Sequence, residues 1–155
     1  MQTEKLLKSL KDNKVRFVVI GATAFPVYGY SRATLDIDIF IQPERTNAQR
    51  TLKALRKFGY DVADISVEDL LTKKVLIRQY LTEADIHPFV TGVTFEKVWK
   101  DKKKARFGET FVWFASLADL IAMKKAASRP KDLEDLKHLI RIKKRISNRR
   151  REERS

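Results

Sequence analysis

The sequence predicts an α/β fold (an α+β arrangement of one mixed sheet), in which a mixed central β-sheet is flanked by helices. Two apolar runs rich in β-branched residues, 17–20 and 35–41, have the composition of buried strands. Segments with helical periodicity precede the first run, at 3–11, and follow the second, at 46–58. Alternation of strands and helices along a chain is typical of the α/β class.

Length and composition predict one domain. The chain has 155 residues, of which 43% are hydrophobic, and this suits a compact domain with a sizeable core. We expect that domain to cover residues 1–146, followed by a basic, frayed C-terminal tail at 147–155. The chain has no cysteine, so disulfides and thiolate metal sites are excluded.

The charge balance is strongly basic. Lysine and arginine number 33 against 20 acidic residues, which gives a net charge of +13. Such an excess favours a polyanionic partner, and it also attracts a triphosphate to a cleft. Much of the excess lies in two short runs, 143–145 and 149–151. Since a charged tail is often only a solvated end, both interpretations stay open.

No segment has the pattern of a signal peptide or a membrane span. Residues 1–10 intersperse lysine with leucine and lack a continuous apolar region. The most apolar window, 111–123, is too short to cross a bilayer and contains Ser116 and Asp119. We therefore expect a soluble, cytoplasmic protein with no membrane partner.

Patterns in the N-terminal half of the sequence predict the first helices and strands. The first helix, from Thr3 to Lys11, carries three leucines on one face, and we expect it to cover the sheet with Thr3 as its N-cap. A strand from Val15 follows. The helix after the second strand opens with a capping-box pattern formed by Thr46 and Gln49.

The C-terminal half predicts a hairpin, a further strand and three helices. Lys131, Asp132 and Asp135 are interpreted as a structural ion-pair network at the start of the last helix. The expected strands are 74–81, 84–87 and 109–114, and the expected helices are 95–104, 116–128 with Ser116 as N-cap, and a last one from Pro130.

Two acids stand within the second apolar strand. Because side chains alternate across a strand, Asp36 and Asp38 point to one face, and Leu35, Ile37 and Ile39 point to the other. Two carboxylates this close repel each other and lose hydration, and a divalent cation removes most of that cost. The pattern favours a metal site over its alternative, an exposed edge strand with two solvated acids.

A glycine precedes this strand at a change of backbone direction. Gly21 ends the first strand, and its missing side chain allows the amides of Ala22, Thr23 and Ala24 to approach an anion. A phosphate there, beside a metal on the two aspartates, would form a nucleoside triphosphate site.

A third acid lies in a later strand. If that strand pairs beside the first acidic one, Asp85 joins Asp36 and Asp38, since neighbouring strands are about 4.8 Å apart. Its alternative role is an ion pair with Arg78. We expect His87, which follows Asp85 on the strand, to face the opposite side and to be a buried or surface histidine without a catalytic role.

Several short motifs occur in order along the chain. They are Gly21-Ala22-Thr23-Ala24, Tyr28-Gly29, Arg32-Ala33-Thr34, Asp36-Ile37-Asp38, Ala84-Asp85-Ile86, Thr91-Gly92-Val93-Thr94-Phe95, the run 117–124 and the run 129–136. This ordered set resembles the signature of the polymerase-β-like nucleotidyltransferase superfamily. It is most similar to the small bacterial and archaeal members, which include the minimal nucleotidyltransferases and the AbiEii-type toxins, and it covers about residues 15–139.

The resemblance implies the nucleotidyltransferase fold and a transfer of NMP from an NTP to an acceptor hydroxyl. Asp36 and Asp38 would hold Mg²⁺ on the triphosphate, and Asp85 would bind a second Mg²⁺ and help to deprotonate the acceptor. Two cations about 4 Å apart stabilise the attacking and the leaving oxygen of an in-line displacement. The three aspartates are therefore the predicted catalytic and metal-binding residues.

Nucleotide binding is assigned to Gly21, Ala22, Thr23, Arg32 and Lys124. The superfamily usually has Gly-Gly or Gly-Ser at the first two positions, so a serine hydroxyl is missing here, and Thr23 or the backbone amides would replace it. Arg32 either holds a phosphate or braces the first aspartate. Lys124 either reaches the triphosphate or complements a helix dipole.

The acceptor and the partners follow from the basic surface and the toxin-like relatives. They favour RNA, such as a tRNA end, and leave open a protein hydroxyl or a small aminoglycoside-like molecule. One alternative is a catalytically inactive module of this fold that binds nucleic acid or a partner protein. Another is an antitoxin-like protein that docks through its basic tail. A homo-oligomer or an antitoxin partner that completes the site is compatible with so small a domain.

Overall fold

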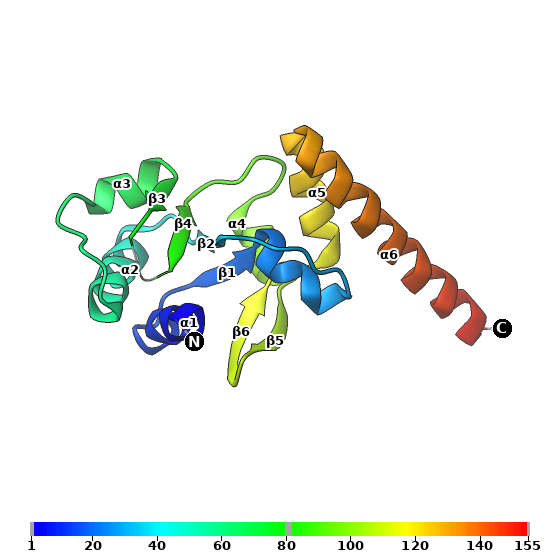
Figure 1. Ribbon diagram of the computed structural model, residues 1–155, viewed down its shortest axis with the longest axis horizontal. Coiled ribbons are helices and arrows are strands. Elements are labelled where there is room, and N and C mark those ends of the chain that lie inside the picture. Colours follow the sequence, from blue (N-terminus) through cyan, green and yellow to red (C-terminus); the bar gives the residue numbers. More distant parts are fainter. Residues whose placement is uncertain (1, 80–81, 155) are drawn as a thin grey trace.

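The computed structural model describes residues 2–79 and 82–154 (Figure 1). Six strands form one mixed sheet, which confirms the predicted fold class. The strands are β1 (Phe17–Ile20), β2 (Asp36–Ile41), β3 (Val75–Ile77), β4 (Glu83–His87), β5 (Lys103–Phe107) and β6 (Thr110–Phe114). The helices are α1 (Gln2–Asp12), the 3₁₀ helix η1 (Gly21–Tyr28), α2 (Arg45–Phe58), α3 (Val67–Thr72), α4 (Phe95–Lys100), α5 (Leu117–Ala127) and α6 (Pro130–Arg154).

The sheet has the order β3-β4-β2-β1-β6-β5. Strands β1 and β2 are antiparallel neighbours, whereas β2 pairs in parallel with β4. In the parallel pair, Asp38 lies directly opposite Asp85, and Phe40 lies opposite His87. The central position of β2 therefore places its acids beside those of a strand that is distant in the sequence.

Apolar periodicity explains how the helices cover the sheet. All four residues of β1 are buried, as the uninterrupted apolar run requires for a strand covered on both faces. Leu6, Leu7 and Leu10 of α1 are fully buried, as predicted, and α1 packs against α2. Phe95 of α4 packs edge-on against Phe40 at the end of β2. Helix α6 starts beside α5 and then projects away from the sheet (Figure 1).

The predicted helix over 95–104 is too long. Helix α4 ends at Lys100, and residues 103–107 form β5, which pairs with β6. Half-buried Ala105 and Phe107 alternate with exposed Lys104 and Arg106, which is the period of a strand. Pairing with β6 through a tight turn at Gly108 (φ 64°) thus overrides the helical preference of the lysines.

The ends of three other elements also differ from the predictions. Helix α2 begins one residue earlier than expected, and its cap is Glu44, whose carboxylate accepts from the amides of Thr46 and Asn47. Strand β3 stops at Ile77, and residues 80–81 of the predicted strand lie outside the described residues. Helix α6 continues to Arg154 where fraying was expected from residue 147. None of the described helices is long and apolar enough to cross a membrane.

Candidate functional site

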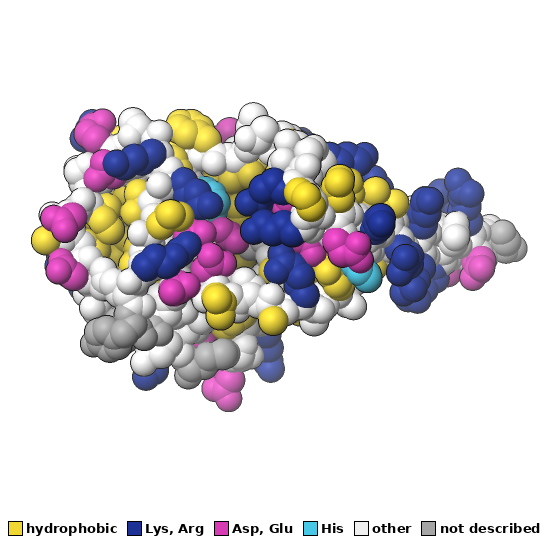
Figure 2. All heavy atoms as spheres, turned by 45° about the horizontal axis from the view of Figure 1, so that its top comes forward, with side chains coloured by type: hydrophobic (Ala, Val, Ile, Leu, Met, Phe, Trp, Pro, Cys, Tyr) yellow, Lys and Arg dark blue, Asp and Glu magenta, His cyan; other side chains and the backbone are white. Residues whose placement is uncertain are grey.

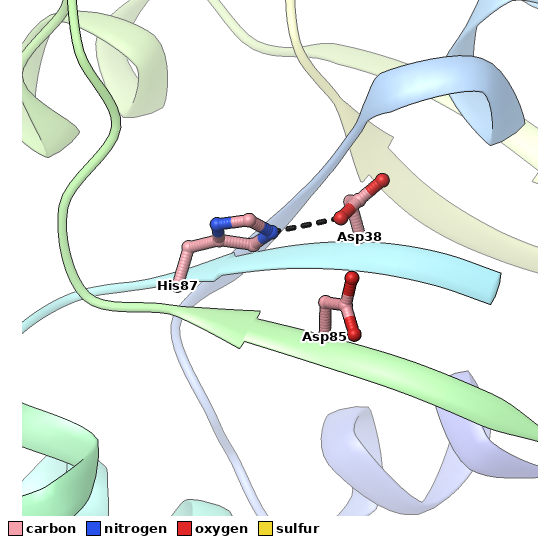
Figure 3. Close-up of side chains that lie close together, drawn as sticks. All are labelled: Asp38, Asp85 and His87. Atoms are coloured by element: carbon pink, nitrogen blue, oxygen red, sulfur yellow. Dashed lines mark hydrogen bonds and ion pairs between the residues drawn. The ribbon is translucent and has the colours of Figure 1, made fainter. Parts of the chain in front are cut away.

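Three potential ligand side chains converge on one face of the sheet where β2 and β4 pair (Figure 3). Asp38 comes from β2, and Asp85 and His87 come from β4. One ligand atom from each of the three lies within 4.8 Å of the others. The strand pairing on which the expected position of Asp85 depended is therefore present, and the two strands are parallel.

The expected orientation of His87 was wrong. Residues two apart on a strand share a face, so His87 must point to the same side as Asp85. Its Nε2 lies 2.8 Å from Oδ1 of Asp38, and its side chain is only 14% exposed. The alternation that located the paired aspartates would also have located this histidine.

Asp36 lies next to this group, and its contacts are different. Arg78 joins the acids at this end of the strands: its Nη1 donates to Oδ1 of Asp85 over 2.7 Å, and its Nη2 lies 3.4 Å from Oδ2 of Asp36. Glu83 is 3.9 Å from the same guanidinium. The hydrogen bond to Asp85 is the main reason that the pKa of Arg78 is raised. The ion pair considered as the alternative role of Asp85 is thus formed.

Gly21 leaves room for the carboxylate of Asp38. It has a left-handed backbone (φ 70°) at the junction of β1 and η1, where the sequence predicted a turn from strand to helix. A Cβ atom at this residue would lie 2.5 Å from Oδ2 of Asp38, well inside contact distance. Glycine is therefore required both for the backbone and for the close approach of the carboxylate.

Most of the predicted site residues line a polar cavity of about 130 Å³. All three predicted aspartates line it. Figure 2 shows acidic side chains gathered in a hollow with lysine and arginine side chains beside them. The other lining residues are Gly21, Ala22, Arg32, Thr34, Lys74, Lys124, Arg129 and Lys131. Of the predicted nucleotide-binding set, Thr23 lies outside this cavity and lines a neighbouring one together with Ala22 and Arg32.

A hollow with apolar walls adjoins the polar cavity. Both cavities are lined by Gly21, Asp38 and Lys124. The apolar contribution comes from residues of β1, α5 and the segment after β4, which are Ile20, Val90, Leu120, Met123 and Ala127. The site thus combines a charged centre with an apolar wall, the combination that binds a ligand with a charged part and a flat organic part.

Arg32 and Lys124 are held by buried acids of α6. Arg32 donates to both carboxylate oxygens of Asp135, at 2.8 and 2.9 Å, and so does not brace Asp36. Lys124 lies 3.0 Å from Asp132 and 3.1 Å from Asp135. Asp132 and Asp135 thus form an ion-pair network at the start of α6, as predicted, but their partners are Lys124, Arg32 and Arg129, whose Nε is 2.6 Å from Asp132, in place of the expected Lys131.

Burial and hydrogen bonds oppose each other in this network. Burial alone would raise the pKa of Asp132 and Asp135, but the bonds from their cationic partners outweigh it and lower both pKa values. Tyr30 adds a hydrogen bond to Asp135, and its own pKa is raised, first by burial and then by that bond. Both acids therefore remain ionised at neutral pH and fix two cations at the wall of the cavity.

The comparison with protein families decides what kind of protein carries this site. Residues 1–148 match the family described as "Nucleotidyltransferase of unknown function (DUF6036)". The chain belongs to this nucleotidyltransferase family. This confirms the resemblance drawn from the ordered motifs. No curated protein matches the sequence.

Solved structures agree on the fold of this nucleotidyltransferase. The lincosamide antibiotic adenylyltransferase LnuA, solved with lincomycin bound, aligns with a TM-score of 0.62 at 16% identity over 91% of this chain and 96% of LnuA. A presumed nucleotidyltransferase from Thermotoga maritima, TM1012, aligns with a TM-score of 0.55 at 16% identity over 99% of this chain and 91% of TM1012. At such identities the agreement concerns the fold alone.

Proposed function

We propose that this chain is an Mg²⁺-dependent transferase that moves NMP from an NTP to an acceptor hydroxyl. The observation that carries the proposal is the cavity in which Asp36, Asp38 and Asp85 lie together among lysine and arginine side chains. Carboxylate oxygens are the ligands that Mg²⁺ prefers. The donor set of this structure therefore fits the cation, and the surrounding positive charges fit a triphosphate.

The roles proposed for the acids follow from their positions. Asp36 and Asp38 would hold the ion on the triphosphate, and Asp38 and Asp85 would hold the second. When bound, the two ions supply positive charge to the attacking and leaving oxygens. Asp85 would take the proton of the acceptor hydroxyl. The acceptor oxygen then forms its bond to the α-phosphorus, the bond from the α-phosphorus to the bridging oxygen breaks, and pyrophosphate leaves.

The neighbouring residues would bind and orient the nucleotide. Lys124 and Arg32 are fixed by the acids of α6, so they present positive charge without first having to be ordered. Gly21 and Ala22 would provide backbone close to the acids, and Thr23 lines the neighbouring cavity together with Ala22. A preorganised cationic wall of this kind stabilises the charge that develops on the phosphates.

Helix α6 supports RNA as the acceptor. A groove of about 410 Å³ between α5 and α6 is lined by Lys125, Lys143, Lys144 and Arg151 together with apolar residues. The projecting half of α6 carries further arginines, and basic side chains gather at the right-hand end of Figure 2. Phosphate backbones bind to such stripes of cations through release of counterions. A structured RNA on α6 could present its end to the cavity where the helix begins.

The alternative is an inactive member of the family that binds RNA or a partner protein. Two observations favour it: Ala22 stands where the superfamily usually has glycine or serine, and Arg78 already holds Asp85. An antitoxin partner or a second copy of the chain would be required for catalysis if the lone chain binds no nucleotide.

Calorimetric titration of the four NTPs, with and without Mg²⁺, tests the proposal. The wild type should bind at least one NTP only when Mg²⁺ is present, and the Asp36→Asn, Asp38→Asn double variant should not. The matched control removes two exposed acids far from the cavity, Asp12→Asn and Asp64→Asn, and should bind like the wild type. Metal-independent binding that survives in the first double variant would contradict the proposal.

An acceptor screen follows with the NTP that binds, labelled at its α-phosphate. Transfer of label to tRNA is expected, and it should fall when Lys143 and Lys144 are changed to glutamate while NTP binding is retained. Label on protein or on an added aminoglycoside or lincosamide, with none on RNA, would overturn the RNA acceptor and keep the transferase.

A further inference from the structure

The histidine of the sheet has a place in the acid cluster that the superfamily signature does not include. His87 projects from β4 toward Asp38, and the close-up view shows its ring nitrogen directed at that carboxylate with Asp85 beside both (Figure 3). Among the described residues, Asp38, Asp85 and His87 form the group whose ligand atoms all lie within 4.8 Å of one another, and Asp36 is not part of it.

We propose that His87 is a metal ligand, and that together with Asp38 and Asp85 it forms a position that prefers Co²⁺, Zn²⁺ or Mn²⁺ to Mg²⁺. This inference rests on the metal site of the proposed function and adds a specificity-determining residue to it. Mg²⁺ selects oxygen ligands, whereas imidazole suits the transition metals. One nitrogen in the ligand set therefore changes which cation the position favours.

The burial of the three side chains supports a role as ligands. Asp85 is 5% exposed and His87 is 14% exposed, so both have lost most of their hydration in the folded state. Asp38 is confined between the imidazole, which faces its Oδ1, and the backbone of Gly21, which faces its Oδ2. Asp38 and His87 are held closely enough to need little reordering to accept an ion, whereas Asp85 would first have to release its bond to Arg78.

The position differs from the one expected at Asp36. Asp36 and Asp38 offer only oxygen, and Asp36 faces the guanidinium of Arg78 at the other end of the cluster. Asp38 would thus be shared between an all-oxygen position suited to Mg²⁺ and a mixed position that includes His87. Two cations of different type would then occupy the site, in place of the two Mg²⁺ ions that the resemblance implies.

Manganese electron spin echo spectroscopy on the full chain provides a direct test. Mn²⁺ bound to the wild type should show coupling to an imidazole nitrogen, and this coupling should disappear in His87→Gln. The chain has two histidines, so the matched control is His138→Gln. His138 stacks on Tyr30 and lies 3.5 Å from Glu134, outside the acid cluster, so the coupling should persist in that variant.

Calorimetry with Co²⁺ and Mg²⁺ gives the second readout. Loss of a residue that only supports a metal ligand costs about 10–100-fold in metal affinity. Loss of a ligand should cost at least as much, so His87→Gln should weaken Co²⁺ binding by about 10–100-fold or more. It should weaken Mg²⁺ binding much less. Metal binding without nitrogen coupling would overturn the role of His87 as a ligand, reduce it to a residue that orients Asp38, and leave the proposed function intact. Absence of any metal binding in the wild type would overturn both.

Discussion

Two groups of aspartates lie near the same cavity, and their surroundings differ. Asp132 and Asp135 of α6 are at most 2% exposed, and each contacts two cations. The side chain of Asp38 is 26% exposed, and among the described residues its partner within ion-pair distance is a histidine, His87. The acids of α6 therefore have fully compensated charge, whereas Asp38 at the sheet does not. Asp85, which is buried and lies near Arg78 and Lys74, resembles the acids of α6 in this respect.

The difference separates a structural role from a chemical one. A buried carboxylate with two cationic partners stabilises the fold, because removing it leaves those cations without compensation. A carboxylate that is partly open and lacks a full cationic partner has residual affinity for an added cation. Stability should therefore depend on the acids of α6, and metal binding on the acids of the sheet.

The largest expected effect comes from removing one of the two buried acids of α6, Asp132 and Asp135, which we call the helix group. Asp132→Asn should lower the free energy of unfolding by about 3–5 kcal/mol, because Lys124 and Arg129 lose a buried partner. Asp38→Asn should change it by about 1 kcal/mol or less, since that residue has no buried ion pair to lose. Urea unfolding followed by circular dichroism measures both values. Equal losses in the two variants would erase the distinction between the groups.

Lowering the pH should reduce the stability that Asp132 and Asp135 contribute to the fold. The pKa values of Asp132 and Asp135 are lowered from their usual 3.8, so the folded state binds fewer protons than the unfolded state in this range. Their contribution is fully present above about pH 5, well above the unfolded value, and is lost progressively as the pH falls through the lowered values. Unfolding free energies measured at pH 7, 4 and 3 should fall less steeply in Asp135→Asn than in the wild type. Identical slopes would contradict the prediction.

A pair of glycine variants tests whether the acids of the sheet, Asp38 in particular, depend on the space beside Gly21. Gly21 and Gly29 both have positive φ, but a Cβ atom would meet Asp38 at the first and nothing within 4 Å at the second. Each change to alanine should cost about 1 kcal/mol of stability through backbone strain. Only Gly21→Ala should also weaken metal binding, by about 10-fold or more, because it displaces a ligand. Equal metal affinities in the two variants would show that Asp38 tolerates the displacement.

The smallest expected effect concerns the cation already present at the sheet. Arg78 is 41% exposed, and its bond to Asp85 would compete with a metal at the proposed site. Arg78→Gln should therefore raise metal affinity up to about fivefold, which corresponds to an exposed ion pair worth at most about 1 kcal/mol. Calorimetry with Mn²⁺ measures the change, with Arg56→Gln, an exposed arginine of α2, as the control. Weaker binding would show that Arg78 assists the metal site.

Local sequence patterns were sufficient for most of the fold. Continuous apolar runs identified β1 and β2, and leucine spacing identified α1, because strands and helices have distinct periods. The boundary between α4 and β5 was missed, since lysine-rich segments satisfy the helix pattern until a pairing strand is known. The shared face of the acidic pair on β2 followed from alternation, and the strand that carries Asp85 followed from its composition and the turn before it.

The remaining site residues depend on long-range geometry. Arg32 binds Asp135 across 103 positions, and no local pattern indicates which of the many basic residues pairs with that acid. The partner of Asp85 was anticipated only as one of two alternatives. His87 could have been found, because its spacing from Asp85 already places both side chains on one face.

The parallel pairing of β2 with β4 also determines when the acid cluster can exist. Asp38 and His87 are 49 positions apart, and no hairpin connects their strands. Closing such a separation costs loop entropy before any contact compensates for it, so pairings of this kind form late in folding. Neighbouring elements such as β1 and β2 can assemble first without completing the cluster. A nascent or partly folded copy of this chain therefore lacks the assembled cluster of Asp38, Asp85 and His87.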